Sequence, residues 1–97
     1  MASVYILKSV TRDKFYIGFT TDPPLLRLER HNTDYYQDKY SSFYKPWELF
    51  WTLLCENNEQ ARAIELHIKK MKSKKYNENL VKYPEIGQKL LEKYSKG

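Results

Sequence analysis

The sequence holds 97 residues, of which 41% are hydrophobic, 15% aromatic and 30% charged, with a net charge of +5 and one cysteine. This composition excludes a disordered or collagen-like chain, and the length suits one domain with one modest core. The lone Cys55 excludes an internal disulfide framework and a multi-cysteine zinc site. No apolar run approaches the ~20 residues of a membrane span, so we expect one cytoplasmic domain over residues 1–97.

Two strands are predicted near the N-terminus, over residues 3–9 and 14–20. They read SVYILKS and KFYIGFT, and the short polar segment between them is typical of a hairpin. A helix is expected to begin at Asp22 and the proline pair that follows it, and to continue to Asn32. Residues 33–45 are rich in tyrosine and polar side chains, which indicates a long loop.

A third strand is predicted over residues 46–56, and a long helix follows with Asn57 or Asn58 as its cap. Its apolar residues recur at helical spacing and predict a core-facing stripe: Ala61, Ile64, Ile68 and Met71. One or two short helices close the chain and are separated near Pro84. This order predicts an α+β fold, a small three-stranded antiparallel sheet flanked by helices, with a core over about 3–80 and a helical extension over about 81–97.

The charge is unevenly distributed along the chain. Residues 1–61 hold seven Lys or Arg against eight Asp or Glu, whereas residues 62–97 hold ten against four, a net charge of +6. A basic surface of this kind often faces phosphates. A solvated, lysine-rich helical surface explains the charge alone equally well.

The first two strands place two tyrosines and a glycine together. Positions two apart in a strand share a face, so Tyr16 and Gly18 point the same way and the residues between them point into the core. If the strands pair as a hairpin, Tyr5 lies beside Tyr16, and Gly18 leaves open backbone that a bulky group such as a phosphate can approach. A simple cross-strand aromatic pair is the alternative interpretation.

Two further positions have the chemistry of a phosphate site. Arg27 and His31 lie four apart and share a helix face, with Arg30 beside them, and the arginine fork suits phosphate. Glu65 lies at the margin of the apolar stripe, where a shielded carboxylate must be paired or bind a cation. A hydrated Mg²⁺ or Mn²⁺ tolerates such a single carboxylate, while an ion pair with Lys69 is the alternative.

These motifs, in this order, resemble the GIY-YIG nuclease family over residues 3–80. SVY (3–5) resembles the first family motif, and YIG (16–18) is the second, word for word. RLERHN (27–32) resembles the segment that bears the family arginine and often a histidine, and ARAIELHIKK (61–70) resembles the helix with the metal-binding glutamate. KKYN (74–77) resembles a motif of the repair-nuclease branch of the family. KPWEL (45–49) is similar to a segment of small stand-alone members and of a nuclease subunit that cuts branched DNA.

The resemblance implies a metal-dependent endonuclease that nicks DNA, with six catalytic residues: Tyr5, Tyr16, Arg27, His31, Glu65 and Asn77. Glu65 would hold one divalent cation, Mg²⁺ or Mn²⁺. Family members differ over which tyrosine is the general base, and we favour Tyr5, with Tyr16 orienting the water or phosphate. A free tyrosine has a pKa of about 10, so the cation and Arg27 would supply the charge that activates it.

DNA is the expected partner, and a set of basic residues is expected to follow its backbone: Arg30, Lys45, Lys69, Lys70, Lys72, Lys74 and Lys75. Such contacts position DNA without reading its bases, so specificity would come from branched or single-stranded DNA or from a protein partner. Four tyrosines are candidates for stacking unpaired bases or for anchoring a loop: Tyr35, Tyr36, Tyr40 and Tyr44. The alternative functions are a non-catalytic nucleic-acid-binding module and a basic protein-interaction adaptor.

Overall fold

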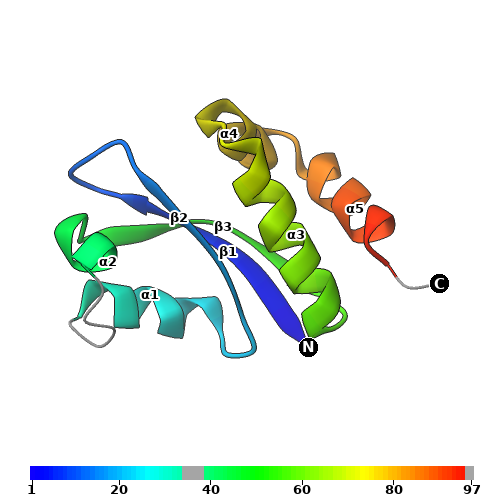
Figure 1. Cartoon of the computed structure of the whole chain (residues 1–97), viewed down its shortest axis with the longest axis horizontal. Helices are drawn as coiled ribbons and strands as arrows, with labels where there is room; N and C mark the ends of the chain where they lie inside the picture. The colour runs from blue at the N-terminus through cyan, green and yellow to red at the C-terminus, as the bar shows by residue number, and fades with distance from the viewer. Residues whose placement is uncertain (34–38, 96–97) are drawn as a thin grey trace.

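The computed structural model describes residues 1–33 and 39–95, which form three strands and five helices (Figure 1). In chain order these are β1 (Ala2–Ser9), β2 (Phe15–Thr20), α1 (Pro24–Asn32), α2 (Lys39–Phe43), β3 (Trp47–Cys55), α3 (Asn58–Met71), α4 (Lys74–Lys82) and α5 (Pro84–Lys93). The strands form one antiparallel sheet in the order β2-β1-β3. The predicted α+β fold is confirmed.

Alternation along β1 gives the sheet two different covered faces. Val4 and Ile6 point to one face, where α3, α4 and α5 lie, while Tyr5 and Leu7 point to the other, beside α1 and α2 (Figure 1). Both faces are therefore covered by helices. β2 is an edge strand of this sheet, so side chains from both faces can meet along it.

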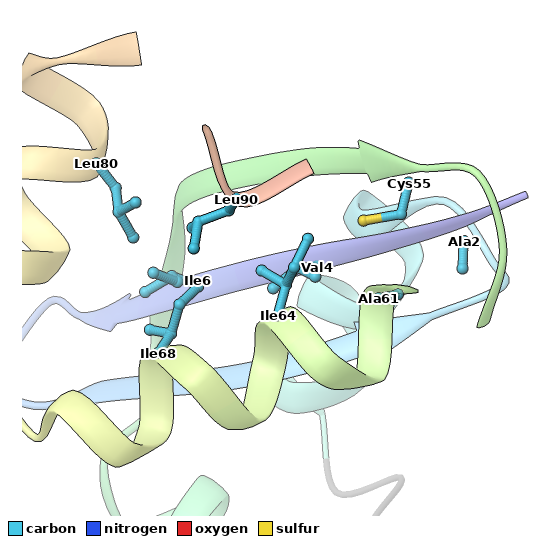
Figure 2. Close-up of a cluster of buried hydrophobic side chains, with 9 residues drawn as sticks. All are labelled: Ala2, Val4, Ile6, Cys55, Ala61, Ile64, Ile68, Leu80 and Leu90. Carbon is cyan, nitrogen blue, oxygen red and sulfur yellow. The ribbon is translucent and has the colours of Figure 1, made fainter. Parts of the chain in front are cut away.

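The main core lies between β1 and the apolar stripe of α3, whose side chains point at the sheet (Figure 2). Nine buried residues make up this core: Ala2, Val4, Ile6, Cys55, Ala61, Ile64, Ile68, Leu80 and Leu90. Met71 was expected in the stripe but is 46% exposed, because α3 ends at this residue. Helices α4 and α5 each supply one core leucine and thus close the far side of this core.

A register shift in β3 redirects its side chains. Ile6 pairs with Trp51 but Leu7 pairs with Leu49, so β3 has one extra residue between these pairs. An extra residue inverts the alternation that follows it. Trp47 and Leu49 consequently lie with Tyr5 in the second cluster, on the face of α1 and α2.

The prediction of a loop over residues 33–45 is wrong for part of this range, since Lys39–Phe43 form the short helix α2. The reason lies in its aromatic spacing: Tyr40 and Tyr44 are four residues apart, and their ring centroids lie 4.8 Å from one another. The Tyr44 ring also packs on Trp47, with centroids 6.3 Å apart, so Tyr44 anchors this segment. Tyr35 and Tyr36 lie outside the described residues.

Local capping defines the ends of α3 and the start of α4. The Asn57 side chain accepts a hydrogen bond from the Gln60 backbone N–H at 2.8 Å, so Asn57 rather than Asn58 is the cap. Lys72 ends α3 in the left-handed region, with φ of 48°, and Ser73 then caps α4. None of the described helices has the length and apolar character needed to cross a lipid bilayer.

His67 lies where α3, α4 and α5 meet. Its Nδ1 atom is 2.9 Å from the Tyr94 hydroxyl oxygen, and its ring faces Tyr76. Burial, and then the positive charges of Lys93 and Lys70, hold the pKa of His67 below its ordinary value of 6.5. The neutral imidazole is thus the form that the folded state prefers.

This shift predicts a pH-dependent stability. The unfolded chain binds more protons at this site than the folded one as pH falls below 6.5, so the free energy of unfolding is expected to fall with pH in that window. A His67→Gln variant, measured by thermal unfolding between about pH 5 and pH 7.5, should show a smaller pH dependence. Equal pH dependence of the two proteins would contradict this role of His67.

Candidate active site

Tyr5 and Gly18 are direct partners across β1 and β2. A Cβ atom added to Gly18 would lie 2.7 Å from the Tyr5 hydroxyl oxygen and 2.8 Å from its Cζ, so the Tyr5 ring lies directly against the glycine backbone. Tyr5 is 2% exposed. The expectation that Gly18 leaves open backbone for a phosphate is therefore corrected: the Tyr5 ring fills that space.

Two phenols and an imidazole meet on this face of the sheet. The Tyr5 and Tyr16 rings lie 6.4 Å apart with 21° between their planes, as the strand pairing predicts. His31 of α1 is 2% exposed, its ring centroid is 4.3 Å from that of Tyr16, and its Nε2 atom is 3.3 Å from the Tyr5 hydroxyl oxygen. The imidazole thus contacts both tyrosines.

Helix α1 is fixed to the sheet at both ends. The Arg27 Nε–H donates to the Thr20 hydroxyl at 3.0 Å, which holds this guanidinium at the end of β2. Arg30 instead lies 3.6 Å from the Asp22 carboxylate. Arg27 therefore contacts the sheet, as its four-residue step to the histidine favours. Thr20 is buried and was not predicted as part of the site.

The C-terminal end of α1 is joined to β3 through Asn32. Its side-chain amide donates to the Trp47 carbonyl at 2.9 Å and accepts a hydrogen bond from the Trp47 backbone N–H. These two bonds fix the rotation of α1 against the sheet and thereby set the direction of its side chains in the site. Residues His31 and Arg27 then share the face that points toward β1 and β2.

Glu65 is a buried carboxylate on α3, 4% exposed. Its Oε1 atom is 3.0 Å from an Arg62 nitrogen, and its Oε2 atom is 3.2 Å from the Lys69 ammonium. The ion pair with Lys69 is the alternative to cation binding that the sequence spacing suggested. The second ion pair, with Arg62, was not predicted, although Arg62 lies at i−3 on the same helix face. Both partner side chains are about half exposed.

This row of three charges runs along β2. The Arg62 guanidinium carbon lies 5.9 Å from the centroid of the Phe19 ring, and Lys69 lines a cavity together with Phe15 and Tyr16. Since Glu65 lies between the two cations on the same face of α3, it also faces this strand. The β2 strand therefore separates the tyrosines from the carboxylate and connects the two halves of the site.

Asn77 lies in the first turn of α4 and is 5% exposed. Its Oδ1 atom has no hydrogen-bond partner among the described residues. A buried carbonyl oxygen of this kind needs a donor from water or from a ligand. Asn77 and Lys69 both line a cavity of about 450 Å³, and Lys69 and Tyr16 line a second one of about 300 Å³.

The predicted DNA-binding lysines do not form one continuous surface. Lys69, Lys72 and Lys74 line the larger cavity, whereas Lys70 lies near His67 and lowers its pKa, on the side of α3 that faces α5. Successive helical residues differ by about 100° in direction, which separates Lys70 from its neighbour. Lys75 is exposed on α4.

Lys14 was not predicted as part of the site, and Tyr40 was predicted only as a candidate for base stacking or loop anchoring, yet both line the cavities. One predicted lysine does not line them. Lys14 precedes β2 and lines the larger cavity, and Tyr40 of α2 lines both. The position of Lys14 next to the YIG strand was the available signal. Lys45 precedes β3, is half-buried, and does not line either cavity.

The oxygen donors of the site are compatible with a divalent cation of the magnesium type. Within residues 1–33 and 39–95, no group of three or more His, Cys, Asp and Glu side chains gathers to hold a metal. Mg²⁺ and Mn²⁺ need fewer, since one or two carboxylates suffice when water and substrate phosphate complete the shell. Glu65 fits that requirement, because its partners are long, half-exposed side chains that can rotate away.

A comparison with known protein families gives a match over most of the chain. The family model described as the GIY-YIG catalytic domain matches residues 1–77. The match includes every predicted catalytic position and ends in the first turn of α4. No curated protein and no solved structure gives a significant match to the chain. The family model covers 77 of the 97 residues, and the chain therefore belongs to the GIY-YIG family.

Proposed function

We propose that this chain is a divalent-cation-dependent endonuclease that hydrolyses phosphodiester bonds in DNA. Membership in a nuclease family supports the reaction class. The proposal is supported by two features of β2: two tyrosines and His31 meet on one side of this strand, and α3, which carries the buried carboxylate of Glu65, packs along it. Phosphodiester cleavage needs a base for water, charge opposite the phosphate, and a cation ligand, and these residue types supply all three.

Each residue has a proposed role. Glu65 would hold the cation, which would supply positive charge next to the reacting phosphate. Arg27, held by Thr20, stabilises the charge that develops on the phosphate. Tyr5 takes a proton from the attacking water while its own hydroxyl proton passes to the His31 Nε2 atom, 3.3 Å away.

Two residues complete the proposed site. Tyr16 is half-buried and lines a cavity, so it orients the water or phosphate. Asn77 fixes the geometry through hydrogen bonds, for which its unpartnered Oδ1 atom is suited. The substrate is proposed to be DNA recognised by its structure or with weak sequence preference, and a protein partner can add specificity, because lysine contacts to phosphates do not read bases.

A non-catalytic nucleic-acid-binding module is the second candidate. The observation that favours it is that both oxygens of Glu65 are paired with cationic side chains, Arg62 and Lys69. In this alternative Glu65 orders two basic side chains along β2 and no metal binds.

A plasmid assay separates the candidates. Supercoiled DNA incubated with the protein and Mg²⁺ or Mn²⁺ is expected to become relaxed circles, and EDTA is expected to abolish this, because the reaction depends on the cation. Binding in EDTA should persist and weaken with salt, since lysine contacts do not need the metal. Absence of nicking on plasmid and branched DNA with binding retained would support the second candidate, and absence of both would indicate an adaptor.

Two broader proposals accompany this function. We propose that residues 1–97 act as one domain, because Leu80 and Leu90 belong to the same core as the residues of β1 and α3. We also propose a role in DNA repair inside the cell, where a nicking enzyme would meet its substrate. The repair role rests on the proposed function.

A further inference from the structure

Two cavities adjoin along the outer side of β2. The larger, about 450 Å³, and the smaller, about 300 Å³, share four lining residues: Phe15, Ile17, Tyr40 and Lys69. Since they have these walls in common, the two cavities form one groove, which we term the β2 groove. It begins at Tyr16 and ends at the junction of α3 and α4, where Asn77 lies.

The Tyr40 ring forms a rigid aromatic wall of this groove. Its hydroxyl donates to the Phe15 carbonyl at 3.0 Å, and its ring packs on Tyr44 and Trp47 with centroids 4.8 Å and 6.0 Å away. Tyr40 nevertheless stays 40% exposed. Because these contacts hold the ring in place while part of it stays exposed, a ligand that stacks on it loses little side-chain entropy.

The other end of the groove is basic. Lys14, Lys69, Lys72 and Lys74 line the larger cavity, and no acidic residue of the described chain lines either cavity. Lys69 is paired with Glu65 and Lys74 with Asp13, whereas within the described residues Lys14 and Lys72 form no ion pair. Two ammonium groups are thus available to a phosphate.

The buried amide of Asn77 adds a polar contact at this basic end. Its buried Oδ1 atom has no hydrogen-bond partner among the described residues and needs a donor. Nucleic-acid bases carry N–H donors on their edges. The groove therefore combines an aromatic face, two cations and a hydrogen-bond acceptor, the groups that recognise a nucleotide whose base is accessible.

We propose that the β2 groove binds an unpaired DNA strand next to the cutting site, with a base stacked on Tyr40 and the adjoining phosphate held by Lys14 and Lys72. In a duplex the faces of each base are covered by its neighbours, so an exposed aromatic wall favours an unpaired base. This inference rests on the proposed function in one respect, because it defines the substrate as DNA with a single-stranded part. Binding itself needs no catalysis.

The first test measures binding in EDTA by fluorescence anisotropy. The ligands are a labelled oligothymidylate of about ten nucleotides, within the usual range of single-strand site sizes, and a duplex of equal length. Tyr40→Ala is expected to lose about tenfold in affinity for the single strand, the usual scale for one stacked base, and less than about twofold for the duplex. Phe43→Ala is the matched control, since this aromatic lies on the same helix and lines neither cavity.

A second variant does not depend on the packing of Tyr40. Lys72 has a positive φ, so Lys72→Gly removes the ammonium at a position where glycine suits the backbone. The slope of log affinity against log salt should fall by about 0.7, the value of one phosphate contact on a single strand. Lys89→Ala on α5, away from the groove, should leave the slope unchanged.

The outcomes separate this proposal from the nuclease proposal. Equal losses on single strand and duplex for Tyr40→Ala, or a loss for Phe43→Ala as large as for Tyr40→Ala, would overturn the groove proposal. An unchanged salt slope for Lys72→Gly would overturn the phosphate contact. Plasmid nicking that continues in either case would leave the nuclease proposal standing. The expected single-strand binding without any nicking would support the groove proposal and contradict the nuclease proposal.

Discussion

Replacing Glu65 with glutamine is expected to lower the rate of metal-dependent nicking by about a thousandfold, which corresponds to about 4 kcal/mol of transition-state stabilisation. The amide keeps the size of the side chain but removes the charge that the cation needs. Within the described residues, no group of three or more His, Cys, Asp and Glu side chains gathers that could hold the cation without Glu65. Nicking of supercoiled plasmid under excess Mn²⁺ measures the rate.

The binding of Mn²⁺ separates a metal-ligand role from a structural one. Calorimetric titration is expected to show loss of Mn²⁺ binding in Glu65→Gln, whereas stability should change little, because ion pairs with half-exposed partners contribute about 0.5 kcal/mol each. Glu92→Gln, the same change on α5, is the matched control and should nick like the wild type. Near-normal nicking by Glu65→Gln would remove the carboxylate from the mechanism.

Replacing Gly18 with alanine is expected to disturb both stability and activity. The new Cβ would lie 2.7 Å from the Tyr5 hydroxyl oxygen, which must then move although Tyr5 is buried and packed against His31 and Tyr16. Overpacking of this kind costs about 1–3 kcal/mol. We expect the melting temperature to fall by at least about 4 °C and nicking to fall by at least about tenfold.

Gly87→Ala is the matched control for this substitution. Its Cβ would lie 3.3 Å from a terminal carbon of Leu53, a side chain that can adjust, and alanine is the better helix former within α5. A double-mutant cycle adds a second check. Tyr5→Leu should remove most of the stability cost of Gly18→Ala, since the clashing ring is then absent. Additive costs in this cycle would show that Gly18 acts through another contact.

The strands and the main helices could be predicted from local sequence patterns. Alternation in SVYILKS and KFYIGFT assigns the faces of β1 and β2 because the side-chain period of a strand is two, and the stripe of α3 follows from its helical spacing. Glu65 at the margin of that stripe is buried, as its position indicates. These features depend on residues close in sequence.

Other features depend on contacts between distant residues and had no local signal. The role of Gly18 follows from the ring of Tyr5 on another strand, and the place of Tyr40 follows from a helix that packs its tyrosines on Trp47. The extra residue in β3 depends on its pairing with β1, which sequence alternation does not reveal. Metal binding, catalysis and DNA contacts remain predictions that the experiments above address.

The region matched by the family model stops at residue 77, but the hydrophobic interior does not. Leu80 and Leu90 are buried in the same core as the residues of β1 and α3, and the Gln60 amide of α3 donates to the Leu91 carbonyl of α5 at 2.9 Å. A fragment trimmed to the matched region would keep every proposed catalytic group yet expose apolar surface of β1 and α3 to solvent. Shortened versions of this protein for expression or crystallisation should therefore retain both closing helices.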